Sequence, residues 1–303
     1  MLPLLPSSSR YPLPDWNACA VEAKAAALDA AGLDTFYTER GREWVQLLRE
    51  SFGQDYRGYE SANFWLVSSQ PEATCRRLIQ WAESIQVRVM QALALDHTGR
   101  LYGKCPMIVV HDLDVYYDYI SSYLLDGDHA LSGGIYLNGG YGHFVFTFLD
   151  LSSAEGVLAH ELAHALVVHL PLPLWLNEGI AQLCEQTVVG RDTTPYDEVH
   201  EKFDTYWTSE TIQDLWTGRG FNRQDEGQLQ SYYLAKLLTR NLAGDLERFR
   251  ALVHEADAAD AGAAALLKHY GLRLPDMVAE HLGEGDWAPR LPLTVSSAPP
   301  LAR

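Results

Sequence analysis

The sequence is poor in positive charge. It contains 23 lysines and arginines against 40 aspartates and glutamates, so the formal net charge is -17. The acidic residues are spread along the chain rather than gathered in one tail, and a polyanion would therefore be repelled over most of the surface. The composition excludes nucleic acid as the expected partner.

Cysteines and long apolar runs are also scarce. The four cysteines stand far apart without CxxC or any other metal-ligand spacing, so we expect them to be reduced. No apolar run approaches the roughly 18 residues that a membrane-spanning helix needs. The N-terminus lacks a basic start, and prolines interrupt its apolar residues before a signal peptide could develop. We expect a cytoplasmic protein that has no membrane partner.

The first half of the chain shows two patterns. Residues 1–56 are predicted to form an N-terminal extension with two short helices, separated near Gly32 and Asp34. Residues 57–150 alternate strand-like and helical segments, which indicates an α/β subdomain. Its last two strand-like runs are joined by a glycine-rich turn, which favours a hairpin.

The second half is predicted to be helical. Helical periodicity dominates residues 151–285, and the two halves together indicate an α+β fold. Ser152 and Glu155 have the spacing of a capping box, which predicts the start of a helix there. Prolines beyond residue 170 stop this helix. Residues 286–303 are rich in proline and small residues, so we expect a disordered tail.

This helix contains the segment His160-Glu161-Leu162-Ala163-His164. Four residues along an α-helix correspond to about 400° of rotation and about 6 Å of rise, so both histidines project from one face and can bind one metal ion. Glu161 lies about 100° around from His160, where its carboxylate can reach a water on the ion. Zinc lowers the pKa of such a water, and a carboxylate can take its proton. These are the requirements of amide hydrolysis.

A third protein ligand is needed if a tetrahedral zinc ion keeps one position for water. Glu178, near the start of the next helical segment, is the predicted ligand. Glu185 lies two turns later on the same face, where it can orient a ligand histidine. His169 falls one residue short of the third histidine of an HExxHxxGxxH site, and no glycine occupies the intervening position. HExxH alone can arise by chance, but its place in an apolar helix followed by an acidic residue favours a metal site.

The segments HELAH and PLWLNEGIA resemble the gluzincin metallopeptidases, in particular the small peptidase MA-like branch related to thermolysin and aminopeptidase N. In that family the two histidines and the NEG glutamate ligate zinc, and the HExxH glutamate is the base. The resemblance implies one zinc ion per chain and a thermolysin-like zincin fold, with an α/β upper subdomain and a helical lower subdomain. It carries the motifs onto His160, Glu161, His164, Asn177, Glu178 and Gly179, and we expect Asn177 to support the ligands.

The resemblance also implies an edge strand that pairs with a bound peptide. It places this strand in residues 132–138, with Gly133, Gly134 and Ile135 as substrate-binding positions. The two glycines allow another backbone to approach closely, and the following alternation is typical of a half-exposed strand.

The sequence departs from the larger relatives at the oxyanion donor. Those relatives use a tyrosine, and the matching position here is Gln228. Tyr232 or Tyr233 can take this role, but adjacent residues on a helix point in different directions, so at most one reaches the site. Packing of both tyrosines is an equally good interpretation.

The sequence therefore predicts a zinc-dependent metallopeptidase that acts on extended peptides or proteins. The alternative is a catalytically weak or inactive peptidase-like binding or scaffold protein that retains the zinc site, although Glu161 is present. A third hypothesis is the same chemistry on a non-peptide amide or ester. The segment from Gly133 to Leu137 lacks the acid of the aminopeptidase Gly-x-Met-Glu-Asn motif, which favours an endopeptidase.

Overall fold

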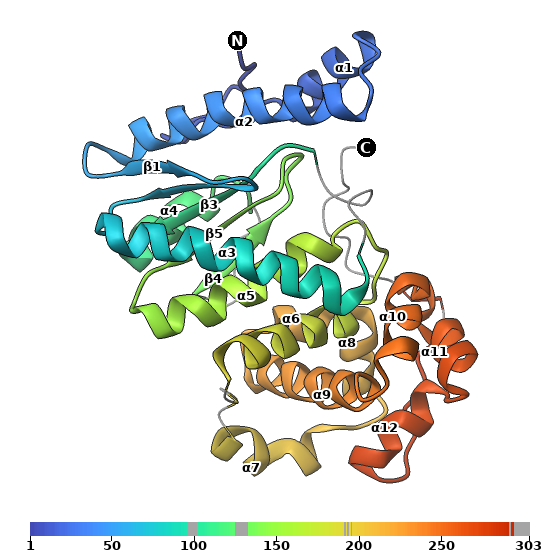
Figure 1. Ribbon diagram of the computed structural model, residues 1–303. Coiled ribbons are helices and arrows are strands. Elements are labelled where there is room, and N and C mark those ends of the chain that lie inside the picture. The colour runs from blue at the N-terminus through green and yellow to red at the C-terminus, as the bar shows by residue number, and fades with distance from the viewer. Residues whose placement is uncertain are drawn as a thin grey trace.

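The chain has an α+β fold. Within the residues that the computed structural model describes, the protein has twelve α-helices and one five-stranded mixed sheet (Figure 1). No described helix is both long and apolar enough to cross a bilayer. The four cysteines, all among these residues, form no disulfide. The structure describes residues 1–95, 102–124, 133–190, 192, 194, 196–290 and 292–293.

The sheet has the strand order β1-β2-β3-β5-β4. The three central strands are parallel to one another, while β1 and β4 lie antiparallel at the two edges. The central strands read as continuous apolar runs because both of their faces are buried. The strand bounds are β1 Arg57–Glu60, β2 Phe64–Ser68, β3 Cys105–Val110, β4 Gly134–Leu137 and β5 His143–Thr147.

Two sequence predictions about this sheet are confirmed. β4 and β5 form a hairpin, and among the described strands β4 lies at an edge and pairs only with β5. Residue 132, at the start of the predicted edge strand, lies outside the described residues. The sequence did not predict β1, whose side chains are mostly exposed and show little apolar patterning.

Helices cover both faces of the sheet. The helices α3 (Glu72–Leu93) and α5 (Leu151–Val167) pack on one face, where they contact Leu66, Val109 and Phe144. The helices α2 (Ala30–Phe52) and α4 (Leu113–Ile120) pack on the other face, against Trp65 and Val145. Figure 1 shows α2 above the sheet and the α3 and α5 pair below it.

The first 56 residues are part of this packing. The helices α1 (Trp16–Ala25) and α2 contribute Trp16 and Trp44 to the core above the sheet. The predicted break near Gly32 and Asp34 is wrong, because Asp29 caps α2 with a hydrogen bond from the Gly32 N–H. At 23 residues, α2 is also longer than the short helix that was expected.

The chain beyond β5 is helical, as predicted. The helix α6 (Leu174–Val189) lies between α5 and α9 (Glu226–Leu242), and one continuous core joins them to the lower face of the sheet. The remaining helices lie beside and below α6 and α9, in the lower half of Figure 1. They are α7 Tyr196–Tyr206, α8 Thr211–Thr217, α10 Leu246–Glu255, α11 Ala263–Tyr270 and α12 Leu274–Leu282.

The start of the predicted disordered tail is ordered. Trp287 is buried, and its carbonyl accepts a hydrogen bond from Trp216 Nε1 at 2.9 Å. Arg290 pairs with Glu210 at 2.6 Å. The prediction is therefore wrong for residues 286–290, because a buried tryptophan fixes them on α8. Residues 291 and 294–303 lie outside the described part of the chain.

Candidate metal centre

The helix α5 presents the first two candidate ligands. It begins at Leu151, and the Asp150 side chain accepts a hydrogen bond from the Ser153 N–H at 2.9 Å. The predicted capping box of Ser152 and Glu155 is wrong, because Asp150 already caps the helix two residues earlier. The helix ends before the prolines, as predicted, and Pro173 is the N-cap of α6.

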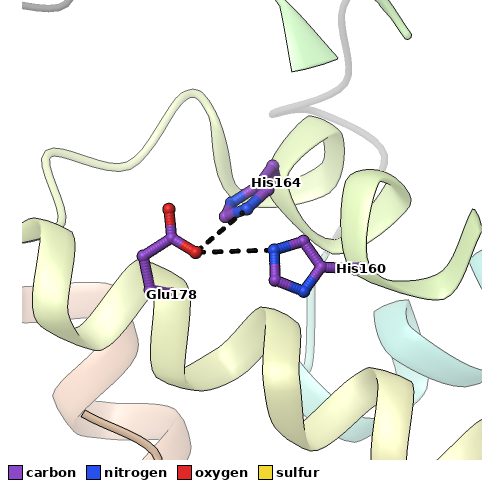
Figure 2. A group of neighbouring side chains, drawn as sticks. All are labelled: His160, His164 and Glu178. Carbon is purple, nitrogen blue, oxygen red and sulfur yellow. Dashed lines mark ion pairs between the residues drawn. The ribbon is translucent and has the colours of Figure 1, made fainter. Parts of the chain in front are cut away.

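Three side chains converge between α5 and α6. His160 Nε2 lies 3.4 Å from Glu178 Oε2, and His164 Nε2 lies 3.5 Å from the same oxygen. Figure 2 shows both imidazole rings turned toward this carboxylate. One ligand atom from each residue lies within 4.8 Å of the other two. Among the described residues, this is the one such group of three or more histidines, cysteines or acids.

The converging atoms suit a cation. Glu178 is 8% exposed, and its Oε2 atom has no hydrogen-bond partner among the described residues. A buried carboxylate oxygen without a hydrogen bond is costly, and an ion between it and two imidazole nitrogens would remove that cost. The site could therefore hold a metal ion.

The other nitrogen of each imidazole also lies near a polar side chain. His164 Nδ1 lies 2.7 Å from Asn177 Oδ1, and His160 Nδ1 lies 3.6 Å from Glu185 Oε2. If each Nδ1 carries the proton, each Nε2 keeps its lone pair for an ion, which is the usual arrangement around metal-binding histidines. Asn177 and Glu185 thus lie where the sequence analysis expected supporting residues.

Gly156 packs beside Glu185 and was not identified from the sequence. An ideal Cβ at this position would lie 3.4 Å from Glu185 Oε1 and 3.3 Å from Val189 Cγ2. Gly156 lies one turn before His160 on α5, and an added methyl group would require these flexible side chains to move by only a few tenths of an ångström. Its place four residues before the first histidine is the sequence signal that could have revealed it.

The charges of the three converging groups are complementary. Burial alone would lower the pKa of His160, but the carboxylates of Glu178 and Glu185 outweigh it and raise the pKa to about 10. Burial likewise opposes ionisation of Glu178, yet the neighbouring His164 and His160 lower its pKa to about 2. The carboxylate therefore stays ionised in a buried position, as a metal ligand must, whereas the proton that it holds on His160 would be displaced by an ion bound at Nε2.

Glu161 stands apart from this group, between α5 and the edge strand β4. Its side chain is 6% exposed, and burial raises its pKa against the opposing effect of His160 and His164. A backbone hydrogen bond from Tyr136 of β4 also acts on the carboxylate. Glu161 is thus a buried carboxylate with raised basicity beside the candidate ligands.

The edge strand reaches α5 because Gly134 has no side chain. An ideal Cβ there would lie 2.5 Å from Val157 Cγ1 and 3.5 Å from Glu161 Oε1. An added Cβ at Gly133, by contrast, would meet nothing within 4 Å. The two predicted glycines therefore differ: Gly133 borders open space, whereas Gly134 permits close packing against α5.

The prediction for Ile135 needs correction. The Thr147 N–H donates to the Gly133 carbonyl at 2.9 Å, so alternate residues of β4 bond to β5 and Ile135 is one of them. The Ile135 side chain packs on the opposite face of the sheet, with the α2 and α4 core. The backbone groups that face the free edge belong to Gly134 and Tyr136.

The two adjacent tyrosines on α9 diverge. Burial, the charges of Glu178 and Glu161 and a hydrogen bond to Glu178 raise the pKa of Tyr232 well above its usual value. Tyr233 instead lies with its hydroxyl 3.0 Å from His200 Nε2, toward α7. The structure therefore brings Tyr232 to the candidate site, whereas Gln228 hydrogen-bonds the Phe221 carbonyl.

Gly179 fixes the distance between α6 and α9. An ideal Cβ at this position would lie 1.9 Å from Thr239 Oγ1 and 2.9 Å from the Ala235 carbonyl oxygen. The second neighbour is backbone, so α6 itself would have to move to accept a methyl group. Because Glu178 is the preceding residue, such a movement would also displace a candidate ligand.

We expect Gly179→Ala to lower the free energy of unfolding by roughly 1–3 kcal/mol, the usual cost of overpacking. Urea denaturation of the two proteins measures the difference. Gly58→Ala is the matched control, because an added Cβ at Gly58 meets nothing within 4 Å. Equal stability of the Gly179 variant and the parent would contradict the close contact between α6 and α9.

No protein-family model matches the chain, and no curated protein matches its sequence. The function must therefore be argued from the chemistry of the site.

Proposed function

We propose that the protein is a zinc-dependent metallopeptidase of the gluzincin type. His160, His164 and Glu178 hold the ion, and Glu161 is the general base. The observation that carries this proposal is the approach of both Nε2 atoms to a single buried oxygen of Glu178, at 3.4 and 3.5 Å. Two imidazole nitrogens and one carboxylate oxygen form a donor set of catalytic zinc sites, with a position left for water.

The surrounding fold supports the same proposal. The sheet and its helices lie above the site, and the helices from α6 onward lie below it (Figure 1). We propose that this arrangement is a thermolysin-like zincin fold. The edge strand beside Glu161 is then the place where an extended peptide pairs, through the Gly134 backbone and the Tyr136 carbonyl, because the Tyr136 N–H already donates to Glu161.

The residues of the chain have separate tasks in the proposed reaction. When bound, zinc would act as a Lewis acid that polarises a carbonyl group and makes a water ligand more acidic. Glu161 accepts the proton of the attacking water and passes it to the leaving amine. Its burial favours this role, because a raised pKa makes the carboxylate a stronger base.

Tyr232 is the proposed oxyanion donor. Its hydroxyl is neutral at physiological pH, and its contact with Glu178 places it beside the candidate ligands. A hydrogen bond from this hydroxyl would stabilise the negative charge that develops on the substrate carbonyl. The contact supports an active enzyme over an inactive binding protein, for which the main argument was the lack of a tyrosine at Gln228.

The proposal is tested by cleavage of a mixed peptide library. We expect the zinc-loaded protein to cleave internal bonds, a chelator to stop cleavage, and added zinc to restore it. Mass spectrometry of the products separates internal from terminal cleavage. A protein that binds zinc but leaves all peptides intact would favour the binding or scaffold alternative, and cleavage of simple esters or amides alone would favour a non-peptide substrate.

We expect Tyr232→Phe to lower kcat by a factor on the order of 10², the usual effect of one lost oxyanion donor. Steady-state kinetics on a library-derived peptide measure the change. Tyr233→Phe is the matched control and should change kcat little, because its hydroxyl faces His200. Equal losses in the two variants would mean that Tyr232 acts only through packing.

A further inference from the structure

Gln182 joins the two helices that carry Glu178 and Tyr232. It lies one turn after Glu178 on α6, and its Nε2 atom donates to the Tyr232 carbonyl oxygen of α9 at 2.8 Å. The same nitrogen donates to the Glu178 carbonyl oxygen at 3.4 Å. The side chain thus bridges the backbone of the third candidate zinc ligand and the backbone of the proposed oxyanion donor.

A primary amide suits these two partners. Both are carbonyl oxygens, and the Gln182 –NH₂ group carries two donors on one nitrogen. The Tyr232 carbonyl has two lone pairs, so it can accept from Gln182 as well as from the N–H four residues later in its own helix. A carboxylate at this position would face both carbonyl oxygens with acceptors only, and an apolar side chain would offer them no donor.

The bond from Gln182 constrains the rotation of α9 about its axis relative to α6. The other close contact between these helices, where Gly179 packs against Thr239 and the Ala235 carbonyl, lies one to two turns beyond Tyr232 on α9. That contact limits how closely the helices approach. A hydrogen bond adds a directional constraint, because it weakens steeply when its angle changes. Gln182 applies this constraint at Tyr232 itself.

The position of the Tyr232 hydroxyl depends on this rotation. The ring packs edge-on against Phe221, with centroids 5.2 Å apart and planes at 87°, and the hydroxyl contacts Glu178. The hydroxyl lies at the far end of the side chain, so a small rotation of α9 moves it further than the backbone carbonyl. A misplacement of about 1 Å can cost on the order of 10² in rate. The contact of Gln182 with the Tyr232 carbonyl therefore bears on catalysis.

We propose that Gln182 is a positioning residue for the proposed reaction. It holds α9 in the rotation that keeps the Tyr232 hydroxyl beside Glu178, where the negative charge of the oxyanion would develop. Gln182 acts through Tyr232 and is not itself a donor to the substrate. The inference rests on the proposed function, because the position of Tyr232 affects the rate only if its hydroxyl stabilises the oxyanion.

Gln182→Met tests this role, since methionine keeps the length and the helix propensity of glutamine but has no N–H donor. We expect kcat to fall about tenfold, which is less than the loss in Tyr232→Phe, while KM and zinc affinity stay within about twofold of the parent. Gln46→Met is the matched control, because Gln46 is exposed on α2 and its amide donates to the exposed Glu50. It should keep the kcat of the parent. Equal kcat in Gln182→Met and the parent would contradict the proposal.

A double variant separates positioning of Tyr232 from a general effect on stability. In a Tyr232→Phe background, Gln182→Met should lower kcat no further, because the hydroxyl that Gln182 positions is already absent. A purely structural role of Gln182 would lower kcat by the same factor in both backgrounds, and that result would overturn the proposal. If Gln182→Met does not fold, Gln182→Asn replaces it, since the shorter side chain draws the amide back by one methylene group.

NMR of the full chain with ¹³C at the tyrosine Cζ position tests the contact without a peptide. The Tyr232 signal, identified by its loss in Tyr232→Phe, should shift in Gln182→Met and stay in place in Gln46→Met. An unshifted signal in Gln182→Met would contradict the role of Gln182, whether or not the parent cleaves peptides. A shifted signal in a parent that cleaves no peptide would instead contradict the proposed peptidase function, and with it any catalytic role of Gln182.

Discussion

Glu161→Gln is expected to lose peptidase activity by a factor on the order of 10² to 10⁴, the usual contribution of a positioned general base. The amide keeps the size and much of the hydrogen bonding of the carboxylate but cannot accept the proton. Because Glu161 stands outside the group of His160, His164 and Glu178, the variant should fold and bind zinc like the parent. Steady-state kinetics and zinc titration measure the two properties separately.

Glu155→Gln is the matched control, since it makes the same change on the same helix away from the site. It should keep both activity and zinc. Loss of zinc in Glu161→Gln would show that Glu161 is a ligand or a structural support. Survival of full activity would place the catalytic centre elsewhere.

Glu178→Ala is expected to weaken zinc binding by more than about a hundredfold. Loss of a residue that only orients a ligand already costs 10- to 100-fold, and Glu178 is proposed to contact the ion directly. Removal of its buried carboxylate also leaves His160 and His164 without their shared counter-charge. Competition with a chromophoric chelator measures the affinity.

His169→Ala is the control for this variant. His169 follows the end of α5 and lines a cavity together with Leu162 and Leu166. It does not belong to the group of His160, His164 and Glu178. The variant should bind zinc like the parent. Equal weakening in both variants would contradict the choice of Glu178 over His169 as third ligand.

Local periodicity explains what could be predicted of the site. The spacing of His160 and His164 fixes their common direction on any α-helix, whatever the helix packs against. Glu178 could be predicted because it follows a proline turn at the start of the next helix, which must fold back on the first. The apolar central strands and the α5 helix were predictable for a related reason, since their patterns are continuous in sequence.

Contacts between distant segments explain what could not be predicted. The choice between Tyr232 and Tyr233 depends on how α9 is rotated about its axis relative to α6. No local sequence pattern predicts this rotation. The direction of Ile135 depends on its register with β5, and a shift of one residue would reverse it. The order of residues 286–290 likewise depends on a distant contact, between Trp287 and Trp216.

The predicted starts of α5 and α2 were wrong for a local reason. Several residues near each start can act as a cap, and the local sequence does not show which of them does. Asp150 and Asp29 cap α5 and α2, although Ser152 and Gly32 also have turn-forming character. These errors move a boundary by two or three residues but leave the helix face that carries the histidines unchanged.

The most direct test of the proposed zinc site is X-ray diffraction from crystals of the zinc-loaded protein on both sides of the zinc absorption edge. We expect one anomalous peak per chain, within bonding distance of His160 Nε2, His164 Nε2 and a Glu178 carboxylate oxygen, about 2.0–2.2 Å from each. Glu161 should lie near the peak without bonding to it. A zinc-loaded crystal with no peak between α5 and α6, or with its peak at His169, would contradict the account.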